Sequence, residues 1–209
     1  MGSQEHTQGT LFIVSAPSGA GKTSLIKALL ETTDGISVST SHTTRIKRQG
    51  EENGVDYHFV DVPTFTNMVD QGAFLEHAQV FDHNYGTSES AVLEQLASGQ
   101  DVILEIDWQG AEQVRIRISG TVSIFILPPS KAALRERLTD RGQDDDTIIN
   151  RRMYDAVAEM SHYHEFDYVV VNDQFETALK DLKTIIASQR FHIHRQKQGL
   201  QTLIDDLLS

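Results

Sequence analysis

A glycine-rich turn follows the first apolar run of the chain and ends in a lysine and a threonine. Its residues are Ala16, Pro17, Ser18, Gly19, Ala20, Gly21, Lys22 and Thr23. This order matches the phosphate-loop pattern Gly-x4-Gly-Lys-Ser/Thr, except that alanine replaces the first glycine. Backbone N–H groups of such a turn point into one concavity, and a helix that begins there adds partial positive charge. We therefore expect Lys22 to reach the β and γ phosphates of a nucleotide and the Thr23 hydroxyl to bind Mg²⁺. The competing interpretation is a plain turn with a surface lysine.

Two carboxylates end a later apolar run, Val102 to Asp107. Side chains alternate across a strand, so Glu105 and Asp107 point to the same face. Carboxylate oxygens suit Mg²⁺, which also takes oxygens from bound phosphates. The alternative is an acidic pair that ends a strand without a function. Beside a phosphate loop, the pair predicts a Mg²⁺ site formed by Thr23, Glu105 and Asp107.

The elements that must position these residues follow from the spacing of apolar side chains. Thr10 to Ser15 is typical of a buried strand, and Thr23 to Glu31 has the spacing of a helix. Three more short apolar runs, each flanked by helix-like segments, cover Asp101–Ile106, Val122–Leu127 and Tyr168–Val171. Such alternation is typical of crossover units around a mostly parallel sheet. The predicted class is α/β, with the phosphate loop after the first strand.

Three segments depart from this alternation. From Val38 to Thr87 the pieces are short, polar and interrupted by glycine and proline, which predicts an inserted subdomain. From Lys131 to about Met160, two helical segments separated by Gly142 and three aspartates predict a helical hairpin. Thr177 to Leu208 is amphipathic and largely helical. We expect its part beyond Ser188 to pack on the body rather than to form a subunit contact.

The composition limits the partners. The 209 residues include 18 Lys plus Arg and 30 Asp plus Glu, which gives a net charge of −12 at pH 7. Because nucleic acids and anionic membranes attract extended basic surfaces, we expect neither as a partner. The chain has no cysteine, and its first ten residues lack the pattern of a secretory signal. We expect a soluble cytoplasmic protein.

Together with the phosphate loop, six further blocks make the chain resemble one family. The family is the bacterial-type guanylate kinases, phosphate-loop enzymes that transfer the γ-phosphoryl group of ATP to GMP. Seven blocks in order are more specific than a phosphate loop alone, and the resemblance runs from about Gly9 to Ile186. The six further blocks are Ser39-Thr-Ser-His-Thr-Thr-Arg45, Gly50-Glu-Glu-Asn-Gly-Val-Asp-Tyr57, Phe74-Leu-Glu-His77, Asn84-Tyr-Gly-Thr87, Ile106-Asp-Trp-Gln-Gly110 and Ile126-Leu-Pro-Pro-Ser130.

The resemblance implies an α/β phosphate-loop NTPase core with a parallel sheet, an inserted GMP-binding subdomain and a helical lid. The guanylate kinase-like domain would span residues 9–188. Its core would comprise residues 9–38, 88–130 and 161–188, its GMP-binding insert residues 39–87, and its lid residues 131–160. Residues 189–209 would form a C-terminal helical tail. ATP would be the co-substrate and Mg²⁺ the cofactor.

The resemblance also implies the site residues. ATP would bind the phosphate loop, with Asn172 and Asp173 near its adenine. The catalytic cations would be Lys22, Arg45 and three lid residues, Arg137, Arg141 and Arg152. Mg²⁺ would be bound by Thr23, Glu105 and Asp107, partly through water. The GMP site would comprise Ser41, Arg45, Arg48, Tyr57, Glu76, Tyr85, Gly86, Thr87, Glu105 and Asp107.

These implied roles agree with the chemistry of the side chains. Guanine presents two adjacent donors on its Watson–Crick edge, and a carboxylate such as Glu76 accepts from both. Adenine presents an acceptor and a donor there, so it would leave buried polar atoms unpaired at about 1–3 kcal/mol each. Guanidinium groups at Arg45 and Arg48 suit the GMP phosphate, and phenols at Tyr57 and Tyr85 add neutral donors. No general base is needed, because a phosphate monoester has a second pKa of about 6.

The chain departs from the family pattern at two positions, and two alternative functions are possible for it. Ala16 replaces a glycine, and Glu105 stands where the family commonly has aspartate, yet we expect activity to be retained. The first alternative is a kinase for another nucleoside monophosphate, such as AMP or dTMP. The second is a non-catalytic guanylate-kinase-like module that binds phosphorylated peptides. The sequence leaves open whether the chain forms a homo-oligomer.

Overall fold

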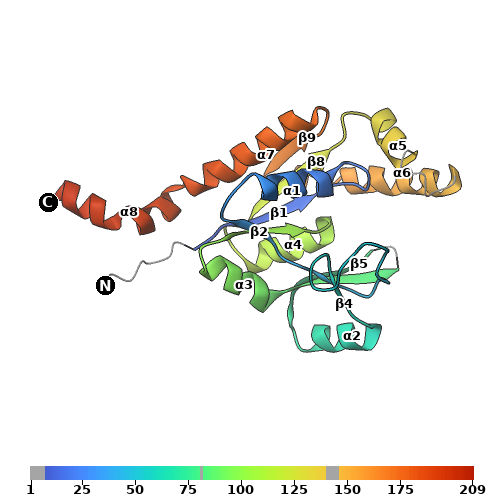
Figure 1. Cartoon of the computed structure of the whole chain (residues 1–209), viewed down its shortest axis with the longest axis horizontal. Helices are drawn as coiled ribbons and strands as arrows, with labels where there is room; N and C mark the ends of the chain where they lie inside the picture. The colour runs from blue at the N-terminus through green and yellow to red at the C-terminus, as the bar shows by residue number, and fades with distance from the viewer. Residues whose placement is uncertain (1–7, 81, 140–145) are drawn as a thin grey trace.

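A five-stranded parallel sheet forms the centre of the protein (Figure 1). The computed structural model describes residues 8–80, 82–139 and 146–209. The order of the strands is β2-β7-β1-β8-β9, and every neighbouring pair is parallel. The predicted α/β class with a parallel sheet is therefore confirmed. The strands are β1 (Leu11–Ser15), β2 (Ile36–Val38), β7 (Asp101–Glu105), β8 (Val122–Leu127) and β9 (Tyr168–Val171).

Helices cover both faces of this sheet because β1 is apolar on both sides. Phe12 and Val14 pack with α1 and α7, whereas Leu11 and Ile13, which point the opposite way, pack with α3 and α4. Figure 1 shows α1 and α7 on one side of the sheet and α3 and α4 on the other. The bounds are α1 (Lys22–Glu31), α3 (Glu89–Ala97), α4 (Trp108–Arg117) and α7 (Phe175–Arg190).

A second, four-stranded sheet lies in the segment where an inserted subdomain is predicted. Its order is β4-β3-β6-β5, and only the β3–β4 pair is parallel. Helix α2 packs against it through Phe65, whose ring centroid lies 4.7 Å from that of Phe74. The Asp61 side chain caps α2 by accepting from the backbone N–H of Thr64. The bounds are β3 (His42–Thr43), β4 (His58–Phe59), α2 (Val62–Asp70), β5 (Phe74–Val80) and β6 (His83–Ser88).

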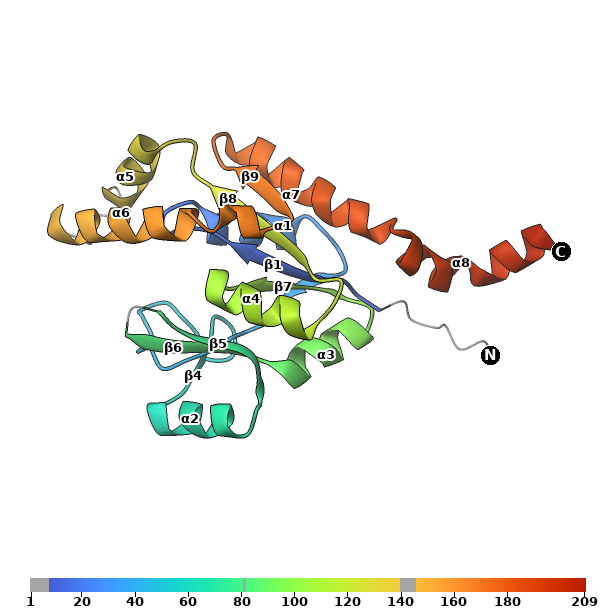
Figure 2. The ribbon, with the colours of Figure 1, turned by 180° about the vertical axis from the view of Figure 1, so that it is seen from behind.

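A helical hairpin, α5 (Lys131–Thr139) and α6 (Asp146–Met160), stands beside the phosphate loop (Figure 2). Ser130 caps α5 by accepting from the backbone N–H of Ala133. The hairpin has a small apolar core of its own, and the turn η1 (Tyr163–Glu165) leads from it to β9. The predicted end of the first helix, with Arg141 and Gly142, lies outside the described residues.

The chain ends in α8 (Ile193–Leu208), which extends from the end of α7 away from both sheets (Figures 1 and 2). The prediction of a largely helical segment up to Leu208 is confirmed, with an interruption at Phe191 and His192. The expectation that this tail packs on the body is wrong for most of its length, because the leucines of α8 are exposed. None of the described helices is both long and apolar enough to span a bilayer.

Candidate active site

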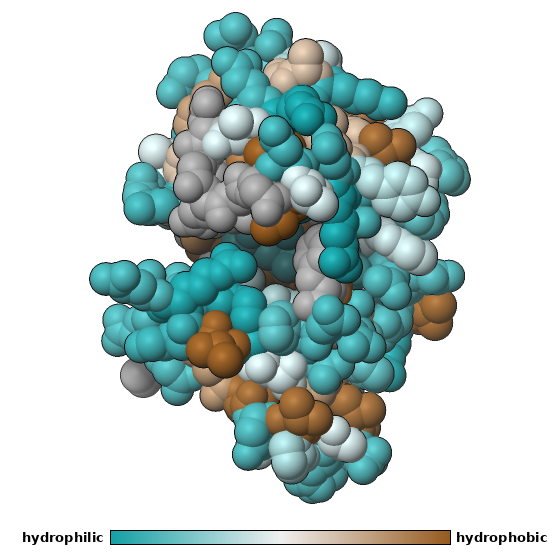
Figure 3. Space-filling view, turned by 90° about the vertical axis from the view of Figure 1, so that its right-hand side faces the viewer, coloured by the Kyte–Doolittle hydropathy of each residue, from teal (hydrophilic) through white to brown (hydrophobic). Residues whose placement is uncertain are grey.

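A cavity of about 320 Å³ opens where the two sheets and the hairpin meet. It lies outside the carboxyl ends of β1 and β7, the edge at which open α/β sheets bind ligands. Figure 3 shows the cleft from its open side, with hydrophilic residues along much of its rim. The cavity brings together thirteen of the predicted site residues: Ala16, Pro17, Ser18, Gly19, Gly21, Lys22, Thr23, Ser41, Tyr57, Glu76, Tyr85, Glu105 and Asp107.

Two glycines set the backbone conformation of the phosphate loop, and a hydrogen bond from Asn172 stabilises it. Gly19 and Gly21 have φ of 90°, the left-handed region that side chains avoid. The amide of Asn172, just after β9, donates to the carbonyl oxygen of Ala20 over 2.7 Å. A Cβ on Gly21 would lie 2.4 Å from the Asn172 amide nitrogen. The structure therefore places Asn172 beneath the loop, whereas Asp173 next to it is exposed.

Ala16 fits the loop without strain. Among the described residues, Asp82 is the one non-glycine residue with positive φ, so position 16 does not need glycine. The Ala16 methyl group packs against the core on the α1 side of the sheet. The departure from the phosphate-loop pattern is therefore compatible with the observed geometry.

Polar side chains of the hairpin contact the loop from α6 and contact Asn172 from α5. Arg152 donates to the Ser18 hydroxyl over 2.7 Å, and Arg137 donates to the Asn172 carbonyl over 2.9 Å. The Glu159 carboxylate accepts from the backbone N–H of Ser18 over 3.2 Å. Burial raises the pKa of Glu159 to about 7, although the Ser18 hydrogen bond and the charge of Lys22 oppose the shift. Of the three predicted lid arginines, Arg152 thus contacts the loop directly, and Arg137 contacts Asn172, whose side chain binds the loop.

Opposite the phosphate loop, the second sheet buries a carboxylate. Glu76 in β5 is 3% exposed and accepts from the Thr87 hydroxyl over 2.6 Å, and the Thr87 and Ser41 hydroxyls lie 3.1 Å apart. Burial raises the pKa of Glu76 to about 7, and the charge of Asp107 adds to the shift. Thr87 and its neighbour Gly86 are both buried, and neither lines the cavity.

Gly110 in α4 is what makes room for Glu76. A Cβ at this position would lie 2.5 Å from a carboxylate oxygen of Glu76. Asp107 caps the same helix, because its carboxylate accepts from the backbone N–H of Gly110 over 3.0 Å and from the Gln109 amide over 3.0 Å. The start of α4 thus positions both carboxylates.

Arg45 stands at the other end of the second sheet, in a bidentate pair with Glu51. The two nitrogen–oxygen distances are 2.8 and 3.1 Å. The hydrogen bond from Arg45 lowers the pKa of Glu51, and the same bond raises the pKa of Arg45. The Arg45 guanidinium carbon also lies 5.4 Å from the Tyr57 ring centroid, and that ring lies 6.0 Å from the Tyr85 ring. Arg48 is exposed and contacts Glu51 through its backbone N–H.

The oxygen donors predicted for a metal converge on the cavity. Thr23, Glu105 and Asp107 all line it. In the described part of the chain, no three His, Cys, Asp or Glu side chains form a metal-binding group by themselves. Such a donor set suits Mg²⁺, which is often held by one or two carboxylates together with substrate phosphates.

Comparison with known proteins identifies the family to which the chain belongs. The guanylate kinase family profile matches residues 8–189. The chain belongs to the guanylate kinase family. It is 58% identical over 200 residues to the guanylate kinase of Alkalilimnicola ehrlichii, with 96% of this chain and 98% of the relative covered. It is 57% identical over 201 residues to that of Saccharophagus degradans, with coverage of 96% and 98%.

The fold agrees with a guanylate kinase structure. The crystal structure of guanylate kinase from Anaplasma phagocytophilum superimposes with a TM-score of 0.76 at 33% identity, over 90% of each chain. Membership of this family makes the chain a nucleoside monophosphate kinase with guanylate kinase activity. The comparisons thus favour GMP over AMP or dTMP as the substrate, and an enzyme over a non-catalytic module.

Three residues of this guanylate kinase site are not predicted by the sequence: Glu51, Gly110 and Glu159. Glu51 and Gly110 lie in blocks that carry the resemblance, but nothing in the spacing shows that they contact Arg45 and Glu76. Glu159 has a usable signal, because it lies seven residues after Arg152 and therefore on the same helix face. Arg141 lies outside the described residues, so its place in the site stays a prediction.

Proposed function

We propose that this cavity is where the phosphoryl group passes from ATP on the phosphate loop to GMP held by the second sheet. The observation that carries the proposal is the buried Glu76 carboxylate, which faces the same cavity as Lys22. An ionised Glu76 accepts from the two adjacent donors of guanine. The Thr87 hydroxyl holds this carboxylate in place, and the Ser41 hydroxyl contacts that of Thr87.

The GMP phosphate is proposed to bind between Arg45, Arg48, Tyr57 and Tyr85. In the structure Arg45 donates two parallel hydrogen bonds to the Glu51 carboxylate, a bidentate geometry that a guanidinium also adopts with a phosphate. Glu51 keeps the guanidinium in this orientation, and Arg48 lies on the same exposed turn. The two phenols border the cavity, where they can donate to the same phosphate.

The ATP phosphates are proposed to lie on residues 16–23, with Lys22 at the β and γ phosphates. Arg152 contacts this loop from the hairpin, and Arg137 contacts Asn172, whose side chain binds the loop, which supports the assignment of that hairpin as a lid. Arg141 is proposed to join them around the transferred group. Asn172 and Asp173 are proposed to lie near the adenine, in addition to the contact that Asn172 makes with the loop.

Thr23, Glu105 and Asp107 are the residues that would hold Mg²⁺, partly through water. When bound there, Mg²⁺ would neutralise charge that develops on the transferred phosphoryl group. Asp107 keeps its orientation through the backbone of α4, so its carboxylate needs no further support. Glu105, at the end of β7, lies beside Val14 of β1, and its longer side chain still borders the cavity.

The reaction joins a phosphate oxygen of GMP to the γ phosphorus and breaks the bond from that phosphorus to the oxygen of the β phosphate. ADP leaves and GDP forms. Because the GMP phosphate is largely dianionic at pH 7, the chain needs no base to activate it. Its contribution is to align the two nucleotides and to place cations around the moving group. A cytoplasmic location, where both nucleotides occur, belongs to the same proposal.

The test is a substrate panel. Initial rates are measured with ATP and Mg²⁺ against GMP, AMP, dTMP and UMP at equal concentrations. We expect kcat/KM for GMP to exceed each of the others by at least about 100-fold, because a hydrogen-bonding pocket discriminates strongly. A higher kcat/KM for AMP or dTMP would overturn the assignment of Glu76 as the guanine acceptor.

A further inference from the structure

The joint between the hairpin and the body contains a stacked pair of rings. Trp108, the first residue of α4, lies against His162, two residues after the end of α6. Their ring centroids are 3.7 Å apart, and their planes differ by 5°. Trp108 packs against the apolar core on the α4 side of the sheet, so it belongs to the body, whereas His162 continues the chain of the hairpin. The stack is therefore a contact between the two parts.

A carboxylate fixes the direction of the imidazole ring. The Nδ1 atom of His162 lies 2.6 Å from a carboxylate oxygen of Glu165, in the turn η1. Because an ionised carboxylate only accepts, Nδ1 carries the hydrogen of this bond. Glu165 is also paired with Arg115 of α4, with 3.7 Å between the nitrogen and the oxygen. Both partners of the imidazole, Trp108 and Glu165, are thus tied to α4.

The His162 ring contributes little to the apolar core. Its side chain is 26% exposed, and that of Glu165 is 30% exposed. Met160, two residues earlier, lies between the core of the body and the core of the hairpin, because it packs against both. Met160 thus supplies the apolar burial at this joint, and the stack on Trp108 sets the direction in which the chain passes through it.

The backbone carries the position of His162 into α6. Its N–H donates to the carbonyl oxygen of Glu159 over 3.2 Å and so continues the last turn of the helix. Glu159 and Arg152 both contact Ser18 in the phosphate loop. Arg152 lies ten residues before His162, so about 15 Å of chain separates them at about 1.5 Å per residue. A rotation of about 10° at the joint would move Arg152 by about 2.6 Å, which would break its hydrogen bond to Ser18.

On the other side of the stack, α4 carries residues of the proposed metal and guanine sites. Trp108 directly follows Asp107, which lines the cavity and caps α4. The same helix makes room for Glu76 at Gly110. It also binds β5, because the Gln113 amide makes two hydrogen bonds with the backbone of that strand. Helix α4 thus contacts both the second sheet and the hairpin, and the stack sets the position of one relative to the other.

We propose that His162 is a positioning residue for phosphoryl transfer: its stack on Trp108 fixes the base of α6 and so places Arg152 at the transferred group. The proposal rests on the proposed function, in which the phosphate loop holds ATP and the hairpin supplies cations. His162 does not line the cavity, and no proton passes through it in the reaction. Because a misplacement of about 1 Å can cost about 100-fold in rate, a ring outside the cavity can change kcat through the helix.

The test is initial-rate kinetics on variants of the full chain, with each nucleotide varied. His162→Ala removes the stack, so we expect kcat to fall about tenfold and KM for ATP to rise about fivefold, with KM for GMP within about twofold. His162→Phe keeps a flat ring against the indole and should stay within about threefold of the wild type in every constant. Equal losses in the two variants would overturn the proposal. Wild-type constants in His162→Ala would overturn it too.

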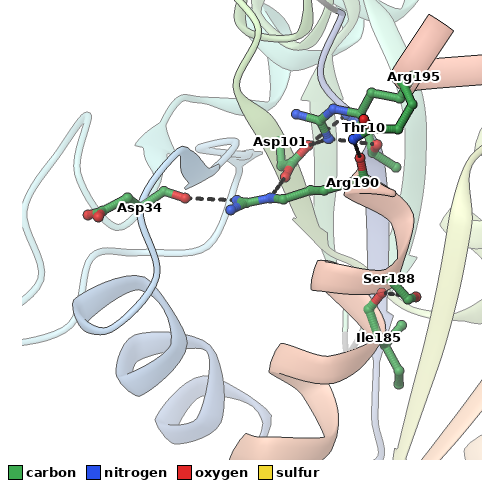
Figure 4. Close-up of polar contacts among 8 residues, drawn as sticks. Thr10, Asp34, Asp101, Ile185, Ser188, Arg190 and Arg195 are labelled. Carbon is green, nitrogen blue, oxygen red and sulfur yellow. Dashed lines mark hydrogen bonds and ion pairs between the residues drawn. The ribbon is translucent and has the colours of Figure 1, made fainter. Parts of the chain in front are cut away.

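Arg190→Ala is the matched control for a general loss of stability. Arg190 donates to the buried carboxylate of Asp101 over 2.8 Å and to the Asp34 carbonyl oxygen over 2.7 Å (Figure 4). Asp101 begins β7, whereas the cavity lies at the carboxyl end of that strand. Loss of these bonds should lower Tm by about 3–10 °C and leave kcat unchanged. The same result in His162→Ala, a lower Tm with unchanged kcat, would show a structural role only and would overturn the proposal.

A double-mutant cycle tests whether His162 acts through Arg152. If it does, His162→Ala should change kcat by about twofold or less when Arg152→Ala is already present, because residues that act as a unit are not additive. Effects that multiply in the double variant would show that the two residues act independently, and the proposal would be wrong. Circular dichroism at the assay temperature verifies that each variant is folded.

Fluorescence tests the stack without any nucleotide. Trp108 is the single tryptophan of the chain, so the emission reports this contact. His162→Ala frees one face of the indole, and quenching by acrylamide should become at least about 1.5-fold more efficient, whereas His162→Phe should match the wild type. Unchanged quenching in His162→Ala would contradict the stack and with it the proposal. A failure of the proposed function would appear in the substrate panel instead, which does not involve His162.

Discussion

Glu159 in the last turn of α6 accepts a hydrogen bond from the backbone N–H of Ser18, at the tip of the phosphate loop. Two turns earlier on the same face, Arg152 donates to the Ser18 hydroxyl. The leucines of α5 also contact this loop, because a Cβ on Gly19 would lie 2.9 Å from Leu134 and from Leu138. The base of the hairpin and the phosphate loop are therefore one packed unit.

Replacement of Glu159 by alanine should weaken ATP binding through the loop. Loss of one hydrogen bond corresponds to about 1 kcal/mol, so we expect KM for ATP to rise about fivefold, with KM for GMP nearly unchanged. Glu159→Gln keeps an acceptor for the Ser18 N–H and should stay within about twofold of the wild type. The measurement is initial-rate kinetics with each nucleotide varied. Equal defects in both variants would show that the charge of Glu159 matters rather than its hydrogen bond.

Replacement of Lys22 by alanine should remove charge stabilisation at the transferred group. We expect kcat to fall by at least about 10³-fold, since charged contacts to the moving phosphoryl act mainly in the transition state. Lys27→Ala on the exposed side of α1 is the matched control and should retain wild-type kcat. Near-normal turnover of the Lys22 variant would remove this lysine from the proposed mechanism.

Replacement of Glu76 by glutamine should weaken GMP binding selectively. One acceptor oxygen becomes a donor that faces a guanine donor, at about 1–3 kcal/mol. We therefore expect KM for GMP to rise about 5-fold to 150-fold while KM for ATP stays within about twofold. Unchanged kinetics with GMP would place base recognition elsewhere in the cavity.

The same variant should become more stable relative to the wild type as the pH rises, because the wild type loses a stabilising contribution that glutamine does not have. In the folded chain burial raises the pKa of Glu76 to about 7 from 4.5, so between these values the folded state holds a proton that the unfolded state has lost. This contribution is complete below pH 4.5 and is lost as the pH rises to about 7. The difference in Tm between Glu76→Gln and the wild type, without nucleotides, should therefore be larger at pH 8 than at pH 5, by at least about 2 °C. A difference that does not change with pH would contradict the raised pKa.

Replacement of Gly110 by alanine should impair GMP binding although it favours the helix. Alanine is a better helix former than glycine by about 1 kcal/mol, but its Cβ would lie 2.5 Å from the Glu76 carboxylate. We expect KM for GMP to rise about tenfold, with KM for ATP unchanged, because the carboxylate must move by a few tenths of an ångström or more. Gly120→Ala is unsuitable as a control because its φ is positive, whereas a comparison of Glu112→Gly with Glu112→Ala, at an exposed position of the same helix, reports the effect of propensity alone.

Local patterns were sufficient for the elements that carry the ATP side of the site. The strand before Ala16, the glycine turn and the helix after Lys22 follow from apolar spacing and from glycine itself, because each is a property of neighbouring residues. Glu105 and Asp107 do line one cavity, but strand alternation is not the reason, because β7 ends at Glu105 and Asp107 is the N-cap of α4. Local patterns also indicated the insert and the hairpin, and the ordered blocks added the family and the roles of the site residues.

Contacts between distant segments were decided only by the tertiary structure. Asn172 lies beneath the loop at Ala20, 152 residues away, and Gly110 opens the space for Glu76 from another element. The amphipathic pattern of α8 is the same whether the helix packs on the body or projects from it. Spacing within a segment records which residues share a face, but the partner of that face depends on where the chain returns in space. The sequence therefore determined the chemistry and the local elements, and the fold decided which side chains meet.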